Sequence, residues 1–128
     1  MSELTPYLAV RDARAASAWY VEHLGAVVTY EPIVMPDGRV GHTELAVEGA
    51  RWMMADEHPE IHVEAPDPLR GAAVTLHLTV GDVDALVDRV LAGGATLDRG
   101  PEDNPVGRVA VFRDPFGHRW FLHQARDS

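Results

Sequence analysis

The chain repeats its own pattern after about 70 residues, and this repeat constrains the fold more than any other feature of the sequence. Four short segments of the first half recur in the second half in the same order, with offsets that fall only from 70 to 68 residues. The matched pairs are residues 5–12 with 75–82, 25–26 with 94–95, 38–40 with 107–109, and 49–52 with 117–120. Collinear matches at a nearly constant offset indicate two copies of one supersecondary unit, at residues 4–55 and 74–124.

Each copy predicts the same order of elements. Alternating residues predict a short strand at the start of each copy, and Asp12 and Asp82 then stand at the N-cap of a helix. Apolar residues from Val83 to Leu91 recur at helical spacing, and glycines at Gly25 and at 93–94 end the two helices. Three strands follow, at about residues 26–35, 39–47 and 51–55 in the first copy and about 95–99, 107–113 and 118–124 in the second. Each copy is therefore expected to be a β-α-β-β-β unit.

Residues 56–73 separate the two copies. This stretch holds three prolines and five acidic residues without periodicity, so we expect an exposed and mobile linker. His58 and His62 flank Glu60 at a spacing that would bring both imidazoles together on a helix and suit a metal ion, but Pro59 argues against a helix there. A solvated surface is the simpler interpretation.

Composition excludes several classes of function. The 128 residues suffice for one domain with a real core, and the absence of cysteine excludes disulfides, thiolate metal sites and a cysteine nucleophile. A formal net charge of −9 disfavours nucleic acid and favours cationic or neutral partners. No apolar run approaches the ~20 residues of a membrane helix, and the first residues show no signal-peptide pattern. We therefore expect a cytoplasmic protein that binds neither nucleic acid nor membranes.

Two motifs connect this organisation to a known family. Residues 35–45 read MPDGRVGHTEL and residues 114–120 read DPFGHRW. Together with the two tandem units, they resemble the vicinal oxygen chelate superfamily, which includes glyoxalase I, extradiol dioxygenases and the bleomycin-resistance proteins, and they most resemble its bleomycin-resistance-like members. The resemblance implies a single α+β domain over residues 1–128, in which two tandem βαβββ units form curved mixed sheets around a cleft.

The resemblance also implies where metal ligands would stand. Metal-dependent members take one ligand from the first and one from the last strand of each unit, and these positions correspond to Thr5, Met53, Thr75 and Phe121. Two hydroxyls, a thioether and a phenyl ring are not the imidazole or carboxylate donors that such ions need. The sequence therefore predicts no metal and no other cofactor, as in a metal-free branch of the superfamily.

The same register predicts a ligand-binding surface. Side chains two apart on a strand share a face, so residues beside the four ligand positions also face the cleft, while Trp52, Met54, Trp120 and Leu122 face the helices. An apolar, aromatic lining with a few polar groups is typical of a small-molecule pocket. The predicted ligand-binding residues are Tyr7, Arg51, Met53, Thr75, His77, Arg119, Phe121 and His123.

Each of these residues also has a purely structural interpretation. Met53 and Phe121 would equally complete a core, and the histidines would be ordinary strand residues. The two arginines would either recognise an anion or pair with nearby acids. Outside this set, Glu44 and His42 share a strand face and form either a proton-transfer pair or a surface or dimer contact.

Three functions follow from these alternatives. The first is a metal-free protein of the bleomycin-resistance type that sequesters a cationic or aromatic antibiotic, or an aromatic metabolite, in clefts at a homodimer interface. The alternative is a glyoxalase-like lyase or isomerase or a dioxygenase-related enzyme, which uses acid–base groups such as Tyr7, His77, His123 and Glu44 or a rearranged metal site. The third is an interaction module whose cleft is blocked by Met53, Phe121 and Tyr7. The first is the function we predict.

Overall fold

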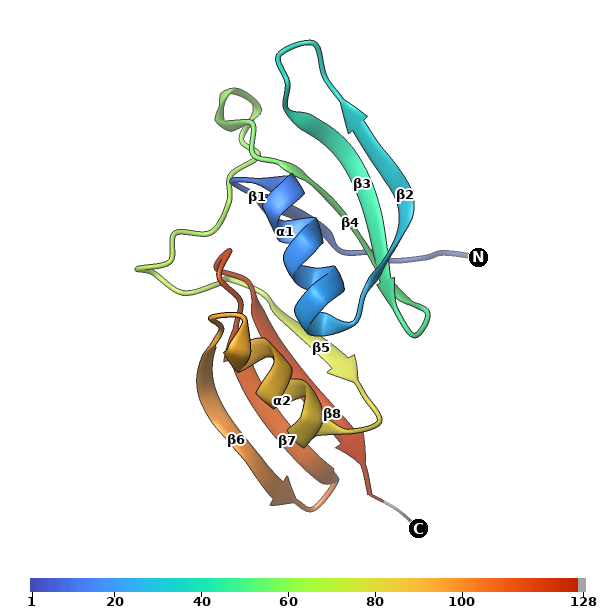
Figure 1. Cartoon of the computed structure of the whole chain (residues 1–128), viewed down its shortest axis with the longest axis vertical. Coiled ribbons are helices and arrows are strands. Elements are labelled where there is room, and N and C mark those ends of the chain that lie inside the picture. Colours follow the sequence, from blue (N-terminus) through green and yellow to red (C-terminus); the bar gives the residue numbers. More distant parts are fainter. Residues whose placement is uncertain (127–128) are drawn as a thin grey trace. The chain divides into compact units, whose positions relative to one another are not determined.

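A computed structural model describes residues 1–126 and divides the chain into two compact units, one up to Ala65 and the other from Pro66 onward (Figure 1). The first unit contains β1 (Tyr7–Val10), α1 (Ala13–Trp19), the π-helical turn η1 (Tyr20–Leu24), β2 (Val27–Val34), β3 (Val40–Val47), β4 (Ala50–Asp56) and the 3₁₀ turn η2 (Pro59–Ile61). The second contains β5 (Thr75–Thr79), α2 (Val83–Ala92), β6 (Thr96–Asn104), β7 (Gly107–Arg113) and β8 (Arg119–Ala125). The predicted α+β class and the tandem βαβββ order are confirmed.

Each unit forms a four-stranded mixed sheet with the same topology. The strand order is β1-β4-β3-β2 in the first sheet and β5-β8-β7-β6 in the second. The first strand of each unit pairs in parallel with the last, while the other neighbours are antiparallel. The last strand therefore lies next to the first strand. Of the positions that the family uses for metal ligands, Thr75 and Phe121 fall on the adjacent strands β5 and β8, whereas Met53 lies on β4 and Thr5 precedes the start of β1.

One face of each sheet packs against the helix of the same unit and forms its core (Figure 1). In the first unit the indole of Trp52 meets the ring of Tyr20 in η1 at 5.3 Å, and in the second the ring of Trp120 stacks on Phe112 at 6.3 Å. Buried side chains alternate along β1 and most of β8, as expected for a half-covered sheet, whereas the central strand β7 is buried almost throughout. The four residues predicted to face the helices are all buried: Trp52, Met54, Trp120 and Leu122.

Both helices begin at the predicted N-caps. The carboxylate of Asp12 accepts a hydrogen bond from the backbone N–H of Ala15 at 3.0 Å, and that of Asp82 accepts from Ala85 at 3.1 Å. A second cap comes from the last strand of each unit: Asp56 accepts from the N–H of Ala13 and Gln124 from that of Val83, at 2.6 and 3.0 Å. The repeat therefore extends to the way in which each last strand holds its helix.

We expect Asp56→Ala to lower the free energy of unfolding by about 2 kcal/mol, because charge-assisted hydrogen bonds are the stronger ones. Its carboxylate accepts from two backbone donors, Ala13 at 2.6 Å and Val40 at 2.7 Å, and so ties α1 and β3 to β4. Urea denaturation measures the effect. Asp12→Ala, which removes an exposed cap with one such bond, is the control and should cost about 1 kcal/mol. An Asp56→Ala midpoint equal to that of the wild type would contradict this role.

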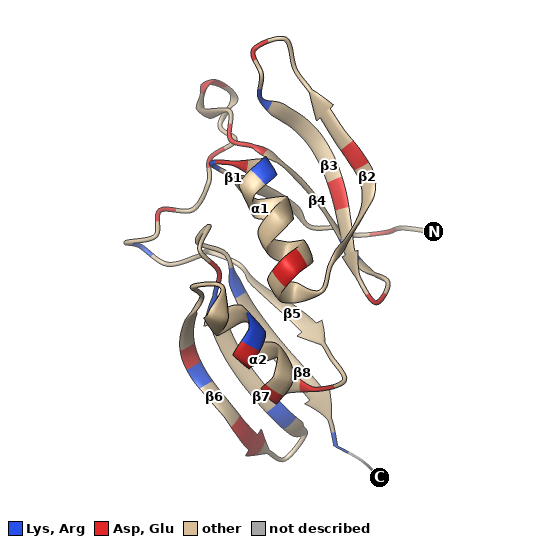
Figure 2. Ribbon diagram, in the orientation of Figure 1, with Lys and Arg blue, Asp and Glu red and all other residues tan. Residues whose placement is uncertain are grey.

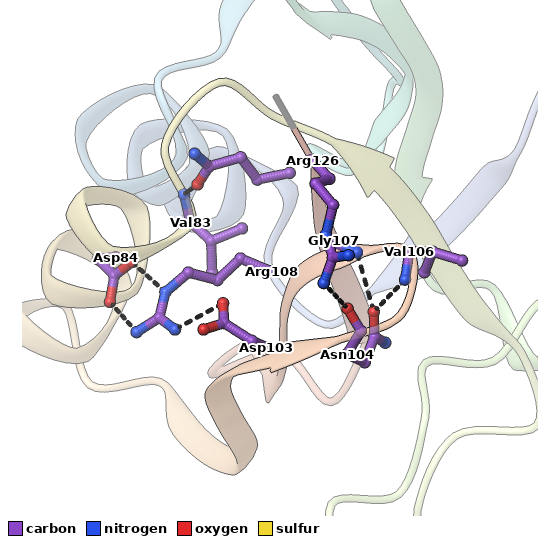
Figure 3. A network of polar contacts seen from close by, with 9 residues as sticks. Val83, Asp84, Asp103, Asn104, Val106, Gly107, Arg108 and Arg126 are labelled. Carbon is purple, nitrogen blue, oxygen red and sulfur yellow. Dashed lines mark hydrogen bonds and ion pairs between the residues drawn. The ribbon is translucent and has the colours of Figure 1, made fainter. Parts of the chain in front are cut away.

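In the second unit a charged contact joins the helix to the sheet (Figure 3). The guanidinium of Arg108 in β7 donates to both carboxylate oxygens of Asp84 in α2, at 2.6 and 2.9 Å, and to Asp103 in β6 at 3.1 Å. This hydrogen bonding from Arg108 holds the pKa of Asp84 below its usual value. The three side chains together connect α2, β6 and β7.

The structure corrects three local expectations. β6 runs to Asn104 rather than ending near residue 99, because the chain passes through Gly100 at a φ of +74° with a shift in register and then continues its pairing with β7. The first helix ends at Gly25, with a φ of 79°, as predicted, but its last turn is π-helical rather than α-helical. The stretch 56–73 is not wholly irregular, because it contains η2 and a bridge between His58 and Val63.

Within the described residues, neither helix is long and apolar enough to cross a bilayer.

Candidate functional site

The sequence-predicted binding residues lie on the sheet faces opposite the helices. In the first unit, register places Tyr7 of β1, Met53 of β4, Glu44 of β3 and Tyr30 of β2 in one row across the sheet. About half the surface of each tyrosine is exposed, at 51% for Tyr7 and 49% for Tyr30. Met53 is half-buried between them. This row therefore presents aromatic and apolar surface that the helix does not cover.

A chain of hydrogen bonds crosses this face. The hydroxyl of Tyr7 lies 2.7 Å from Nδ1 of His42, and Nε2 of His42 lies 2.8 Å from a carboxylate oxygen of Glu44. The rings of Tyr7 and Tyr30 contact the imidazole, with centroids 5.4 and 5.6 Å away. Burial, together with the negative charge of Glu44, raises the pKa of the Tyr7 phenol. His42 and Glu44 are thus a hydrogen-bonded pair, joined to one of the predicted binding residues.

Arg51, the other predicted residue of this unit, pairs with an acid. Its guanidinium lies 3.0 Å from the carboxylate of Glu3, and both side chains are largely exposed. Exposed pairs of this kind contribute at most about 1 kcal/mol. Of the two interpretations of Arg51, the structure shows the ion pair, and recognition of an anion remains a prediction.

In the second unit, the corresponding row is centred on a phenyl ring. Register aligns His77 of β5, Phe121 of β8, Val111 of β7 and Arg99 of β6. The imidazole of His77 stacks on Phe121 at 5.4 Å with an interplanar angle of 18°, and the guanidinium carbon of Arg99 lies 6.0 Å from the centre of the phenyl ring. Aromatic stacking and cation–π attraction favour both contacts. The row therefore combines π surfaces with a cation.

The remaining predicted residues lie on the same face of the second sheet. Arg119 donates to the hydroxyl of Thr75 at 2.8 Å, and Nε2 of His123 donates to the carbonyl of Val106 at 3.1 Å. The imidazole of His123 also lies 5.6 Å from that of His77. All five residues predicted for this unit thus share one face of its sheet, as the period of two requires.

Sequence reasoning missed two aromatic or charged residues on these faces, Tyr30 and Arg99. Both lie near register shifts in β2 and β6, where simple alternation no longer tells which face a side chain takes. Arg99 also forms an ion pair with Glu102, in the part of β6 that lies beyond the strand end expected near residue 99. The only signal for Tyr30 was its place in a predicted strand.

The four family metal positions do not fit a metal ion in this chain. The Thr75 hydroxyl already accepts from the guanidinium of Arg119, and this adjacent positive charge would repel a metal ion. Phe121 stacks on His77, and Thr5 donates to Glu3 at 3.4 Å. Over residues 1–126, no group of three or more His, Asp or Glu side chains is arranged to hold an ion.

Comparisons with known proteins agree with this fold. Protein Rv0887c of Mycobacterium tuberculosis is 41% identical over 125 residues, covering 94% of this chain and 73% of that protein. TnmS3, an antibiotic binding protein from Streptomyces sp. CB03234, matches with a TM-score of 0.66 and 26% identity, over 98% of both chains. TioX from Micromonospora sp. ML1 matches with a TM-score of 0.71 and 25% identity, over 99% of this chain and 98% of that one. The family model described as the Glyoxalase/Bleomycin resistance protein/Dioxygenase superfamily matches residues 4–122, and the chain belongs to this superfamily.

Proposed function

We propose that this chain is a metal-free binding protein that sequesters a small aromatic molecule, either an antibiotic or an aromatic metabolite. Two copies of the chain pair in the cytoplasm and complete the binding clefts. The structural likeness to TnmS3, an antibiotic binding protein at 26% identity, supports a ligand of this kind. The predicted ligand contacts are those on the open sheet faces: Tyr7, Arg51, Met53, Thr75, His77, Arg119, Phe121 and His123.

One observation carries the proposal, the environment of Phe121. At a position where metal-dependent relatives carry a carboxylate ligand, β8 presents a phenyl ring stacked on His77 and close to the guanidinium of Arg99. Flat π surfaces of this kind bind planar rings by stacking, which needs no ion. The ligand is thus held by shape and stacking.

Charge narrows the class of ligand. Acidic residues outnumber Lys and Arg by twenty to eleven, and Figure 2 shows the acidic positions distributed over both units. A protein with this charge attracts cations and repels anions over a distance of about one Debye length. We therefore expect an aromatic ligand that approaches the protein in a neutral or positively charged form.

The test is calorimetric titration of the purified protein with bleomycin, vancomycin and doxorubicin, which represent glycopeptide and aromatic antibiotics. We expect saturable binding of at least one. For that compound, Phe121→Ala should raise the Kd about tenfold or more, because the stacking surface is lost. Leu69→Ala is the matched control, since Leu69 is 93% exposed and lies outside the strands. No saturable binding across the panel, or an equal loss in both variants, would contradict the proposal.

Metal content and assembly are tested separately. Elemental analysis of protein purified without a chelator should find no stoichiometric Zn, Ni, Mn or Fe, because none of the four family positions supplies a suitable donor. Sedimentation equilibrium should give the mass of a dimer. A stoichiometric ion that is lost together with ligand binding upon chelation would overturn the metal-free part of the proposal.

A further inference from the structure

Three titratable side chains on the open face of the first sheet form a continuous path that ends at a half-exposed hydroxyl. Glu44 and His42 lie on β3, whereas Tyr7 lies on β1, and β4 separates these two strands. The phenol of Tyr7 therefore reaches across β4 to meet His42 at 2.7 Å. Ala55, on that face of β4, has a small side chain that leaves room for the crossing.

The donor and acceptor properties of the three groups determine the direction in which a proton can move along this path. The Glu44 carboxylate only accepts hydrogen bonds, so Nε2 of His42 donates to it. In the neutral imidazole, Nδ1 is then an acceptor. The O–H of Tyr7 has two acceptors within reach, Nδ1 at 2.7 Å and the carbonyl oxygen of Gly41 at 3.2 Å, and Nδ1 is the nearer. The lone pairs of the Tyr7 oxygen remain available to accept a proton from outside the protein. The path thus accepts a proton at Tyr7 and leads it to Nδ1 of His42.

The surroundings of the path indicate the group that it would meet. Tyr7 is 51% exposed, whereas the side chains of His42 and Glu44 retain only 23% and 21% of their accessible surface. Solvent and ligands therefore reach the outer end much more readily than the inner one. Beside it, the half-exposed ring of Tyr30 packs edge-on against the imidazole and offers an aromatic wall. A ring that carries a hydroxyl matches both features.

We propose that Tyr7, His42 and Glu44 form a proton-accepting site that binds a phenol or an enol as its anion. This inference rests on the proposed aromatic-ligand function and specifies the substituent that the ligand carries. The ligand O–H bond breaks, and its proton passes to the oxygen of Tyr7. Tyr7 in turn gives its own proton to Nδ1 of His42. The ligand is left as an anion that accepts from Tyr7, and the imidazolium is paired with Glu44, so protons and charge balance without any redox step.

The charge of each group supports this order of proton transfers. Tyr7 finishes neutral, in keeping with its raised pKa, and acts only as a carrier. The negative charge of Glu44 compensates the imidazolium, as the acid of a catalytic triad does for its histidine. Arg51, the basic residue of β4, already pairs with Glu3. Glu44 is therefore the positioning residue, because its carboxylate accepts from Nε2 of His42 and so turns Nδ1 toward Tyr7.

The experiment uses 4-nitrophenol, whose anion has a distinct absorbance, and its methyl ether 4-nitroanisole, which has the same ring but no acidic proton. Both are titrated into the intact protein at a pH below the pKa of the free phenol. We expect bound 4-nitrophenol to show the spectrum of the anion. Glu44→Gln keeps the size of the side chain but should weaken 4-nitrophenol binding about tenfold and reduce the anion spectrum, while 4-nitroanisole binding changes less than twofold. Glu31→Gln, an exposed residue of β2, is the charge-matched control.

Tyr7→Phe is the second variant, because it keeps the ring and removes only the carrier oxygen; it should abolish the anion spectrum. Circular dichroism establishes that each variant is folded. If both probes bind but 4-nitrophenol stays neutral, the inference is overturned while aromatic binding stands. An anion spectrum that persists in both variants also overturns it. If neither probe binds, the inference is overturned, whereas the proposed function fails only when the antibiotic panel also shows no binding.

Discussion

Replacing Asp114 by alanine is expected to lower the free energy of unfolding by about 3 kcal/mol. The side chain of Asp114 is buried, and one carboxylate oxygen accepts from the backbone N–H groups of Phe116 and His118 at 2.9 and 3.0 Å. The other oxygen accepts from the indole nitrogen of Trp120 at 2.9 Å. A single carboxylate thus holds the turn that leads into β8 and the largest side chain behind that strand. Alanine removes all three charge-assisted bonds together.

Guanidinium denaturation followed by far-UV circular dichroism measures this loss. Asp114→Asn keeps one acceptor oxygen and should be intermediate. Asp37→Ala is the matched control, because Asp37 also accepts from a backbone N–H two residues later, that of Arg39, but in an exposed turn. It should cost less than about 1 kcal/mol. Equal losses for Asp114→Ala and Asp37→Ala would show that the buried carboxylate has no special role.

The second large effect is expected from Gly107→Ala, which should also destabilise by about 3 kcal/mol. Gly107 has a φ of 147°, a conformation that side-chain-bearing residues rarely adopt, and an added Cβ would collide with the carbonyl oxygen of Gln124 on the neighbouring strand β8. Its N–H donates to the side chain of Asn104 at 3.0 Å, as does that of Val106 (Figure 3). The clash is with backbone, so relief requires β7 and β8 to separate.

Gly94→Ala separates the clash from the backbone strain. Gly94 has a φ of 92°, but an added Cβ would meet no atom within 4 Å. The cost there should be about 1 kcal/mol, from backbone strain alone. The same denaturation experiment compares the two variants. A Gly107→Ala protein as stable as Gly94→Ala would show that β8 accommodates the methyl group.

Much of the molecule could be predicted from local patterns. The 70-residue repeat predicted two units, the carboxylates at Asp12 and Asp82 predicted both helix starts, and the period of two predicted that Trp52 and Trp120 are buried. Such features depend on residues that are close in sequence, so their physical causes can be seen in the sequence. The assignment of Tyr7 and Phe121 to the open faces succeeded for the same reason.

Other features depended on residues that only the fold brings together. No spacing rule predicts that Tyr7 meets His42, since they are 35 residues apart and lie on strands separated by β4. Likewise, the register shifts around Gly100 decided that β6 continues past residue 99 and that Arg99 lies near Phe121. The sequence by itself determined the repeated unit, its helix caps and the two faces of its strands, because these follow from local sterics and periodicity. Strand order and irregular register are set by pairing between distant segments, so the tertiary structure alone decided which polar side chains meet on the open faces.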